Sequence, residues 1–241
     1  MTTTKILFIF EGQTAENQIT ENLTKFFLNE RTIITCAYCS TIYQIYKEIS
    51  NDDDLDTFSL LKNRKQNKEI LKNYYRDDFA EIYMFFDYDG HDTVAEDSKL
   101  KELLAFFDEE TEKGKLYISY PMIESLKHIS CYETFKELKV VCKENIKYKK
   151  IVDQNCLENL KDFTKYKHET WQNLIQTHLF KLNYIVNDSY TFPENIISQL
   201  DIFSKQLEKY IHVDATVAVL NSFPIFLLDY YGNNKMKKIL E

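Results

Sequence analysis

The sequence predicts an α/β fold with a mainly parallel sheet flanked by helices, followed by a mostly helical C-terminal extension. Nearly continuous apolar runs alternate with helical patterns in the first half of the chain, as expected for a parallel sheet that is covered on both faces. The 241 residues include only 4 Gly and 3 Pro, and this scarcity of turn formers disfavours an all-β sandwich. After about residue 125 the strand pattern fades.

Four apolar runs predict the strands of the sheet. They cover residues 6–10, 33–39, 82–87 and 116–120. Apolar residues at helical spacing predict the helices that connect them. These helices cover residues 15–29, 43–49 and 93–112, with an additional inserted helix at about 57–76. Because strands alternate with helices, we expect βαβ units rather than hairpins.

The second half of the chain carries helical patterns without strands between them. The predicted helices cover residues 157–181, 194–211 and 213–240, the last broken near Pro224. We therefore expect an α/β domain over 1–130 and a helical extension over 131–241, which would bind substrate or form a homodimer.

Composition gives expectations for the partners of the chain, its redox compartment and its relation to a membrane. The net charge is −8, which does not suggest a general polyanion binder, although basic residues are concentrated locally in 62–76 and 136–150. Five Cys and the absence of a signal-peptide pattern predict free thiols in a reducing cytoplasm. The most apolar stretch, 215–231, is interrupted by Asn221, Ser222 and Pro224, so a core helix is expected there rather than a membrane span.

Two aspartates close the third predicted strand, in "FFDYDGHD". Asp87 and Asp89 are two residues apart, so in an extended chain their side chains point to the same side. Two such carboxylates repel each other unless a cation lies between them. Hard divalent ions such as Mg²⁺ or Mn²⁺ favour these oxygen ligands. The pair therefore predicts a metal site at the strand end.

Glu11 and Gly12 end the first predicted strand, in "FIFEGQTAE". In open α/β sheets, ligands bind outside the carboxyl ends of the strands, so Glu11 is expected beside Asp87 and Asp89 if the two strands are neighbours. Taken alone, Glu11 is more readily explained as the cap of the next helix. The aspartates shift the interpretation towards a three-acid site.

These two motifs, in this order and on these elements, resemble the TOPRIM domain of topoisomerases, primases, OLD-type nucleases and stand-alone effectors of anti-phage defence. The resemblance covers about residues 5–130 and is carried by "FEGQTAE" and "FDYDGHD". It implies that Asp87 and Asp89 hold Mg²⁺ or Mn²⁺. It also implies that Glu11 acts as a general acid/base or as a further metal ligand.

Two further acids are candidate metal ligands. "ISYPMIESL" follows the fourth predicted strand and is similar to the defence-effector branch of the family, which places Glu124 at the rim of the site. Asp92 is the other candidate. Both have an ordinary alternative, because Asp92 would also cap a helix and Glu124 would also suit a first helical turn. No zinc ribbon or large cleavage domain is present, so a complete topoisomerase or primase is not expected.

Basic residues of the predicted helix 62–76, and Lys127 near the acids, are candidates for contacts with a nucleic-acid backbone, although a solvated helix face has the same composition. They are Arg64, Lys65, Lys68, Lys72, Arg76 and Lys127.

The resemblance implies a metal-dependent endonuclease that cleaves tRNA, other RNA or DNA. It further implies a toxic effector of abortive infection that is controlled by a partner ATPase. The lack of a P-loop in this chain is compatible with such a partner. The alternative is a catalytically weak TOPRIM module that regulates a partner protein. A nucleotide-binding sensor is disfavoured by the same lack of a phosphate loop.

Overall fold

A computed structural model describes residues 4–28, 32–39, 42–51, 56–88, 90 and 97–241. It confirms an α/β fold with a mainly parallel five-stranded sheet flanked by helices. By its internal contacts the chain forms two compact units that are interleaved in sequence. The first unit contains Met1–Phe86 and Glu102–Tyr117, and the second contains Asp87–Lys101 and Ile118–Glu241. The predicted boundary at residue 130 stays a prediction.

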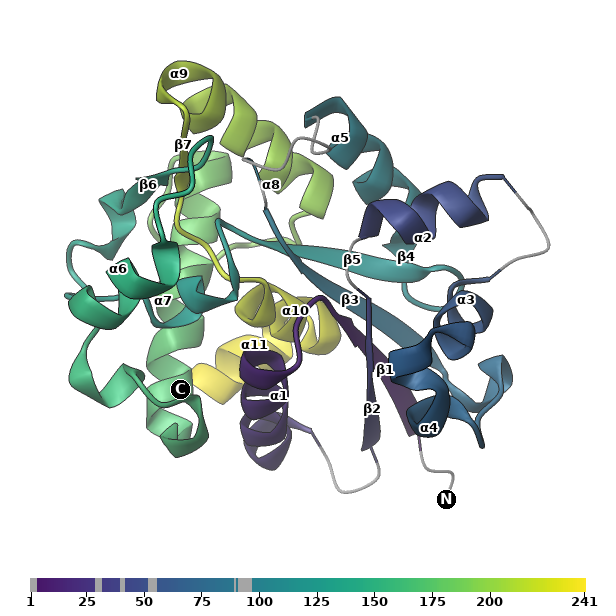
Figure 1. Ribbon diagram of the computed structural model, residues 1–241. Helices are drawn as coiled ribbons and strands as arrows, with labels where there is room; N and C mark the ends of the chain where they lie inside the picture. Colours follow the sequence, from purple (N-terminus) through teal and green to yellow (C-terminus); the bar gives the residue numbers. More distant parts are fainter. Residues whose placement is uncertain (1–3, 29–31, 40–41, 52–55, 89, 91–96) are drawn as a thin grey trace. The chain divides into compact units, whose positions relative to one another are not determined.

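The sheet has the strand order β2-β1-β3-β5-β4 (Figure 1). Its strands are β1 Thr4–Phe10, β2 Thr32–Tyr38, β3 Glu81–Asp87, β4 Asp108–Glu109 and β5 Gly114–Ser119. β1 is parallel to both β2 and β3, and Phe10 lies opposite Tyr38 on one side and Phe85 on the other. β1 and β3 are therefore neighbouring parallel strands, as the prediction for Glu11 required.

Aromatic side chains form the interior of the first unit. The rings of Phe8 and Phe85 meet edge to face at 5.0 Å between centroids, and Phe85 stacks on Tyr117 at 5.6 Å. All three side chains are at most 3% exposed. Such pairs stabilise a core by ~0.5–1.5 kcal/mol beyond the area that they bury.

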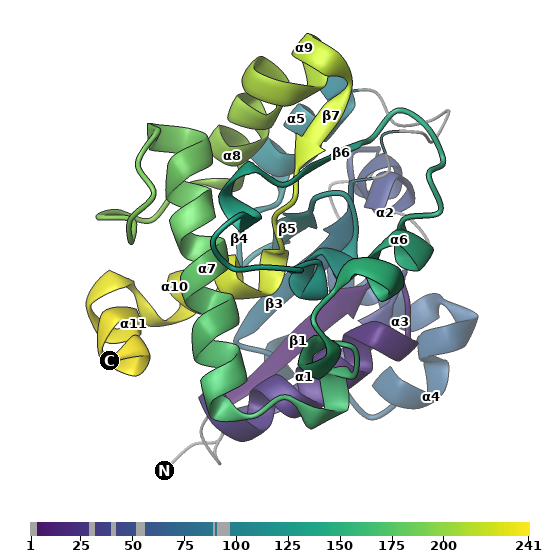
Figure 2. The ribbon, with the colours of Figure 1, turned by 90° about the vertical axis from the view of Figure 1, so that its left-hand side faces the viewer.

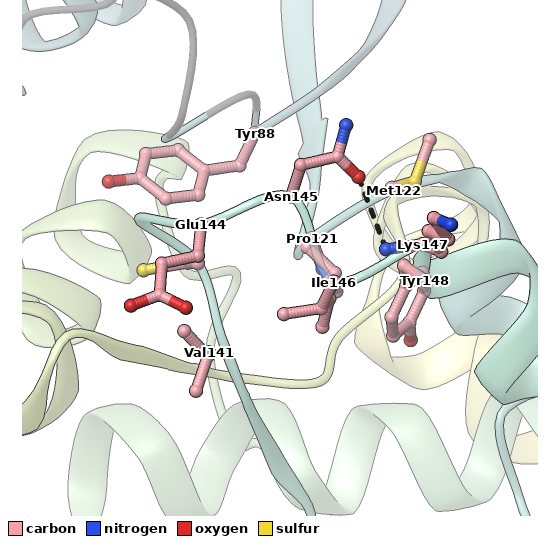
Figure 3. A pocket seen from close by; sticks show the side chains of 10 residues that line it. Tyr88, Pro121, Met122, Val141, Glu144, Asn145, Ile146, Lys147 and Tyr148 are labelled. Carbon is pink, nitrogen blue, oxygen red and sulfur yellow. Dashed lines mark hydrogen bonds between the residues drawn. The ribbon is translucent and has the colours of Figure 1, made fainter.

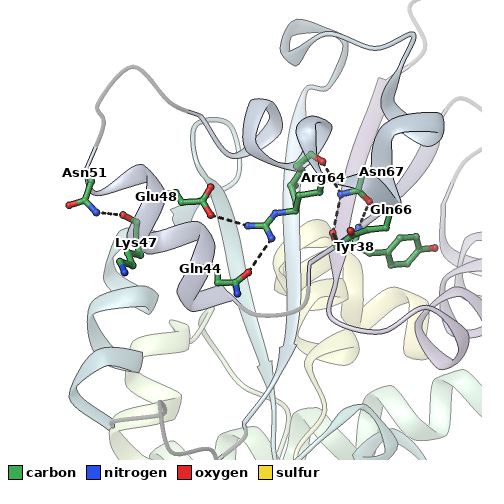
Figure 4. Close-up of polar contacts among 9 residues, drawn as sticks. Tyr38, Gln44, Lys47, Glu48, Asn51, Arg64, Gln66 and Asn67 are labelled. Atoms are coloured by element: carbon green, nitrogen blue, oxygen red, sulfur yellow. Dashed lines mark hydrogen bonds and ion pairs between the residues drawn. The ribbon is translucent and has the colours of Figure 1, made fainter.

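The helices of the first unit differ from the prediction at the insertion. They are α1 Thr14–Phe27, α2 Ile42–Ile49, α3 Thr57–Asn63, η1 Lys65–Asn67, α4 Lys68–Leu71 and η2 Arg76–Asp78. Residues 57–76 thus form several short turns rather than one helix. The reason is Asn67, which is fully buried and uses its amide to bind the backbone of Tyr38 and Leu61, as Figure 4 shows in part.

The helix predicted over 93–112 is shorter than expected. The structure has α5 Asp97–Phe106, after which the chain enters β4. The segment 93–96 lies outside the described residues. An apolar run at helical spacing does not distinguish a helix end from the short strand that follows it.

The second unit is built around the 20-residue helix α7 His168–Asn187. Helices α8 Gln199–Gln206, α10 Ser222–Tyr231 and α11 Asn233–Leu240 pack on it (Figures 1 and 2). Its shorter helical elements are η3 Ile123–Lys127, η4 Phe135–Glu137, α6 Tyr148–Asn155, η5 Glu158–Leu160, η6 Phe163–Lys165, the π-helical turn η7 Leu207–Ile211 and α9 His212–Asp214.

Strands in the second unit were not predicted. β6 Lys139–Val141 pairs with β7 Thr216–Ala218 in an antiparallel ladder. Strands of three residues are too short to show a period, so the prediction of an all-helical second half was incomplete. Pro224 also differs from the expectation of a break, because it stands in the first turn of α10, where a missing N–H costs nothing.

Helix α7 carries a buried amine. Lys181 is 0% exposed, and its Nζ donates to the carbonyl oxygens of Phe135 at 2.8 Å and Leu138 at 2.5 Å. Burial holds the pKa of Lys181 well below its usual range. The same hydrogen bonds can be formed by the two N–H groups of a neutral amine. This side chain links α7 to the segment before β6.

In the part of the chain that the structure describes, no helix combines the length and the apolar character needed to cross a membrane.

Replacing Lys181 with Met should lower the free energy of unfolding by roughly 1–3 kcal/mol, because two hydrogen bonds of ~0.5–1.5 kcal/mol each are lost. The carbonyls of Phe135 and Leu138 keep their backbone donors, the N–H groups of Leu138 and Val219. Urea denaturation measures this change. Lys238→Met in α11, at an exposed position, is the control and should stay within ~0.5 kcal/mol of the wild type. Equal effects of the two substitutions would show that the buried amine is not structural.

Acid should destabilise the fold through two buried histidines. Burial lowers the pKa of His178 from 6.5 to about 3 and that of His128 from 6.5 to about 4. Between these values and pH 6.5 the unfolded chain binds protons that the folded chain does not. The contribution of the neutral histidines to the free energy of unfolding is therefore fully present above pH 6.5 and decreases as the pH falls towards 4.

His178→Gln should make this decline shallower by about one proton, or ~1.4 kcal/mol per pH unit. Denaturant unfolding of the variant and the wild type at a series of pH values measures the difference. The carboxylates contribute equally to both proteins and cancel. Parallel curves across the window would rule out His178 as a source of the acid sensitivity.

Candidate functional site

Glu11 directly follows β1 in the first unit and is half-buried, as predicted for a residue at a strand end. Gly12 follows it. A Cβ added at Gly12 would lie 2.6 Å from Oε1 of Glu16, so the glycine leaves room for the Glu16 carboxylate beside the backbone of the turn.

Glu16 was not among the acids predicted for the metal site. It stands in the first turn of α1 and is only 9% exposed. Burial raises the pKa of Tyr38, and the Glu16 carboxylate adds a smaller contribution in the same direction. The Tyr38 hydroxyl donates to Asn17 Oδ1 at 2.8 Å. The turn after β1 therefore holds two carboxylates, Glu11 and Glu16. The signal was present in the sequence as the second acid of "EGQTAE".

Asp87 is the last residue of β3 and belongs to the second unit, where it shares its surroundings with Glu124. Glu124 stands in η3, the short turn that comes soon after β5. Both carboxylates act on the phenol of Tyr148 in α6, and together with burial they raise its pKa well above the usual value. Two of the predicted acids, from segments far apart in sequence, therefore lie close enough to one buried hydroxyl to raise its pKa.

Glu124 is buried in an unusual way for a carboxylate. It is 6% exposed, and its Oε1 lies 3.3 Å from Nζ of Lys149. Its other oxygen, Oε2, is buried and has no hydrogen-bond partner among the residues that the structure describes. A buried carboxylate oxygen without a donor costs free energy unless a cation or a ligand group satisfies it. Glu124 is thus more than an acid in a first helical turn.

A tyrosine–histidine pair lies behind these acids. His128 Nδ1 and Tyr148 Oη are 2.9 Å apart, and both side chains are buried. The lowered pKa of His128 keeps the imidazole neutral at pH 7, and Tyr148 is neutral as well. The pair therefore holds the Tyr148 ring in place without adding charge. From the sequence, His128 was a candidate for a phosphate contact near the site, but its ring is buried against Tyr148. Tyr148 and Lys149 were not predicted, because no motif connects them to the strand ends.

Lys127 was predicted to contact phosphate, but its side chain is used inside the protein. It is 8% exposed, and its Nζ donates to Asp153 Oδ1 at 2.8 Å and lies 5.1 Å from the centre of the Phe163 ring. This ion pair ties η3 to α6, the two elements that carry Glu124 and Tyr148.

The basic residues of the insertion divide into two groups. Arg64 donates to Gln44 at 3.2 Å and contacts Glu48 at 3.5 Å, as Figure 4 shows. Arg76 donates to three backbone carbonyls, and Lys72 pairs with Glu69. Lys65 and Lys68 are exposed and form no ion pair within the described ranges of the chain. A contact of this segment with nucleic acid stays a prediction that now depends on these two lysines.

Asp89 and Asp92 lie outside the described residues. Among the residues that are described, no three His, Cys, Asp or Glu side chains gather closely enough to hold a metal ion. The joining of Glu11, Asp87 and Asp89 in one metal site therefore stays a prediction, as do Asp92 as a ligand and the identity of the ion.

A pocket of about 230 Å³ lies in the second unit beside these acids (Figure 3). Its walls include Tyr88, which follows Asp87, and Met122, which precedes Glu124 by two residues. Tyr148 forms part of the wall as well. Tyr148 connects the pocket with Asp87 and Glu124, because it lines the pocket and both acids act on its hydroxyl.

Comparisons of the chain with protein-family models, with curated proteins and with solved structures found no match. The arrangement of residues therefore carries the functional argument by itself.

Proposed function

We propose that this chain is a metal-dependent nuclease of the TOPRIM type that cleaves phosphodiester bonds in RNA or DNA. The observation that carries the proposal is the buried Oε2 of Glu124, which lacks a hydrogen-bond donor among the described residues and belongs to a carboxylate that shares the surroundings of Tyr148 with Asp87. A divalent cation satisfies such oxygens well. The parallel pairing of β1 with β3, which places Phe10 opposite Phe85, supports a role for Glu11 at the same sheet edge.

The acids fit a hard cation such as Mg²⁺ or Mn²⁺. Asp87 and Glu124 would hold it, with Asp89 and Glu11 as the further predicted ligands. When bound, the ion would supply charge stabilisation to a scissile phosphodiester. Glu11 would accept a proton from the attacking water, as its position at the strand end allows.

The other groups of the site position and balance charge. Lys149 is 66% exposed at its side chain while its Nζ contacts Glu124, so it can neutralise that acid or reach a phosphate in solvent. Tyr148 and His128 stay neutral, and the contact between their side chains holds the Tyr148 ring in place. The expected setting is a toxic anti-phage effector that a partner ATPase controls. A homodimer formed through residues 131–241 is part of the same proposal.

The second candidate is a catalytically weak module that regulates a partner protein. The lack of a three-residue cluster suited to a metal ion, among the described residues, favours it. The two candidates differ in metal binding and in cleavage, so one set of variants separates them.

We expect Asp87→Asn, Glu124→Gln and Glu11→Gln each to lower cleavage of tRNA or plasmid DNA at least ~100-fold, because removal of a group that acts at the reacting phosphate costs about 10²–10⁴-fold. The assay uses the full chain with Mg²⁺ or Mn²⁺, alone and with a candidate partner ATPase. Titration of Mn²⁺ followed by calorimetry should show a matching loss of affinity for Asp87→Asn and Glu124→Gln.

Glu194→Gln is the matched control for these carboxylate substitutions, because Glu194 is exposed in the same unit and lines a different pocket. It should leave both cleavage and Mn²⁺ affinity unchanged. Cleavage that survives all three substitutions would reject the site, and a chain that neither binds Mn²⁺ nor cuts either substrate would favour the regulatory module.

A further inference from the structure

The pocket that Tyr88, Met122 and Tyr148 line is suited to one small group. Its volume of about 230 Å³ is below the ~300–1,000 Å³ of pockets that hold drug-sized ligands. Most of its wall is apolar, and Figure 3 shows Tyr88 and Glu144 at one end and Met122, Lys147 and Tyr148 at the other. The remaining apolar lining comes from Pro121, Val141 and Ile146.

Two of its aromatic walls are held in fixed positions. Tyr88 donates its hydroxyl to Asp97 Oδ1 at 2.9 Å, and Lys143 donates to both groups. At the other end the hydroxyl of Tyr148 is held by His128. Walls whose side chains are already fixed lose little entropy when a ligand enters.

Gly90 contributes to the same arrangement. A Cβ at this position would lie 2.7 Å from Cε1 of Tyr88 and 2.8 Å from the carbonyl oxygen of Cys142. Only glycine allows the chain to pass this closely between two parts of the pocket wall. The glycine of "FDYDGHD" therefore serves the pocket as well as the turn.

The polar groups of the pocket favour a ligand that offers both a hydrogen-bond donor and a hydrogen-bond acceptor. Glu144 is exposed and, as a carboxylate, only accepts. Asn145 uses its Oδ1 to accept from the backbone N–H of Lys147 at 3.2 Å, which leaves its Nδ2 free of partners among the described residues. A ligand that offers an amino group to Glu144 and a ring nitrogen or carbonyl to Asn145 would satisfy both.

Positive charge lines the approach to the pocket. Lys147 and Lys150 are exposed and form no ion pair within the described part of the chain, and Lys149 lies between them. Although the whole chain has a net charge of −8, Lys147 in the pocket wall and the exposed Lys150 give this segment a local positive charge that suits a phosphate backbone.

We propose that this pocket binds a single unpaired nucleobase that carries an exocyclic amino group, next to the phosphodiester that is cut. This inference rests on the proposed nuclease function and narrows its substrate to single-stranded or unstacked nucleotides. Unpaired bases are recognised in proteins by aromatic and apolar walls together with hydrogen bonds to the base edge. Adenine, cytosine and guanine carry an exocyclic amino group that can donate to Glu144, whereas uracil does not.

The test measures binding and cleavage separately. Fluorescence anisotropy of labelled single-stranded adenosine, cytidine and uridine homopolymers, with EDTA present, reports affinity for the full chain without cutting. Wild type should prefer the adenosine and cytidine strands over uridine by about tenfold. Glu144→Gln and Asn145→Ala should remove this preference. Met122→Trp, which fills the pocket, should weaken binding of all three strands.

Matched controls come from a second pocket of the same unit, which Glu194 and Asn195 line. Glu194→Gln and Asn195→Ala should bind as wild type does. Salt dependence distinguishes base contacts from phosphate contacts, because Lys147→Gln should reduce the slope of log affinity against log salt by about one whereas Asn145→Ala should leave it unchanged.

The outcomes separate this inference from the proposed function. Cleavage by wild type together with unchanged base preference in Glu144→Gln and Asn145→Ala overturns the base pocket and leaves the nuclease intact. Base-selective binding that these variants abolish supports the pocket even in a chain that does not cut. If wild type binds none of the strands, the pocket assignment is overturned.

Discussion

The constraint on which the second unit depends is the buried amide of Asn221. Its Nδ2 donates to the carbonyl of Ile123 and to Oγ of Ser125, both at 3.0 Å, and its Oδ1 caps α10 through the N–H of Phe223. Glu124 lies between the first two partners. One fully buried side chain therefore fixes the turn that carries the candidate acid to the start of a core helix.

The neighbouring backbone strengthens this attachment. Tyr120 and Leu220 exchange two backbone hydrogen bonds, of 2.8 and 3.0 Å, immediately before η3 and α10 begin. On the far side of the turn, Lys127 pairs with Asp153 of α6. These contacts fix η3 on both sides of Glu124, and its carboxylate stays buried at 6% exposure. The missing hydrogen bond at Oε2, among the described residues, is thus imposed by the fold, which is typical of a binding group and unusual for a structural one.

The sequence was sufficient where the signal was local. Continuous apolar runs located the strands, and the acids that follow them, Glu11 and Asp87, could be placed at strand ends from the residue pattern alone. Prediction failed where tertiary contacts decide. The buried hydrogen bonds of Asn67 divide an apparent helix, and the surroundings of Glu124 are completed by Tyr148 and Lys149, more than twenty residues away. Composition and periodicity do not encode such contacts.

Lys149 connects the electrostatics of the acids with those of the pocket. With Glu124 as its partner, its ammonium balances a buried charge that would otherwise be costly. Its side chain is nevertheless mostly in solvent, between Lys147 and Lys150, where a phosphate would compete for the same ammonium. One lysine cannot neutralise the carboxylate and a phosphate fully at the same time. Binding of a polyanion to Lys149 therefore weakens its ion pair with Glu124. A divalent cation bound at the acids would then neutralise the Glu124 carboxylate. Substrate and divalent ion should for this reason bind with positive cooperativity.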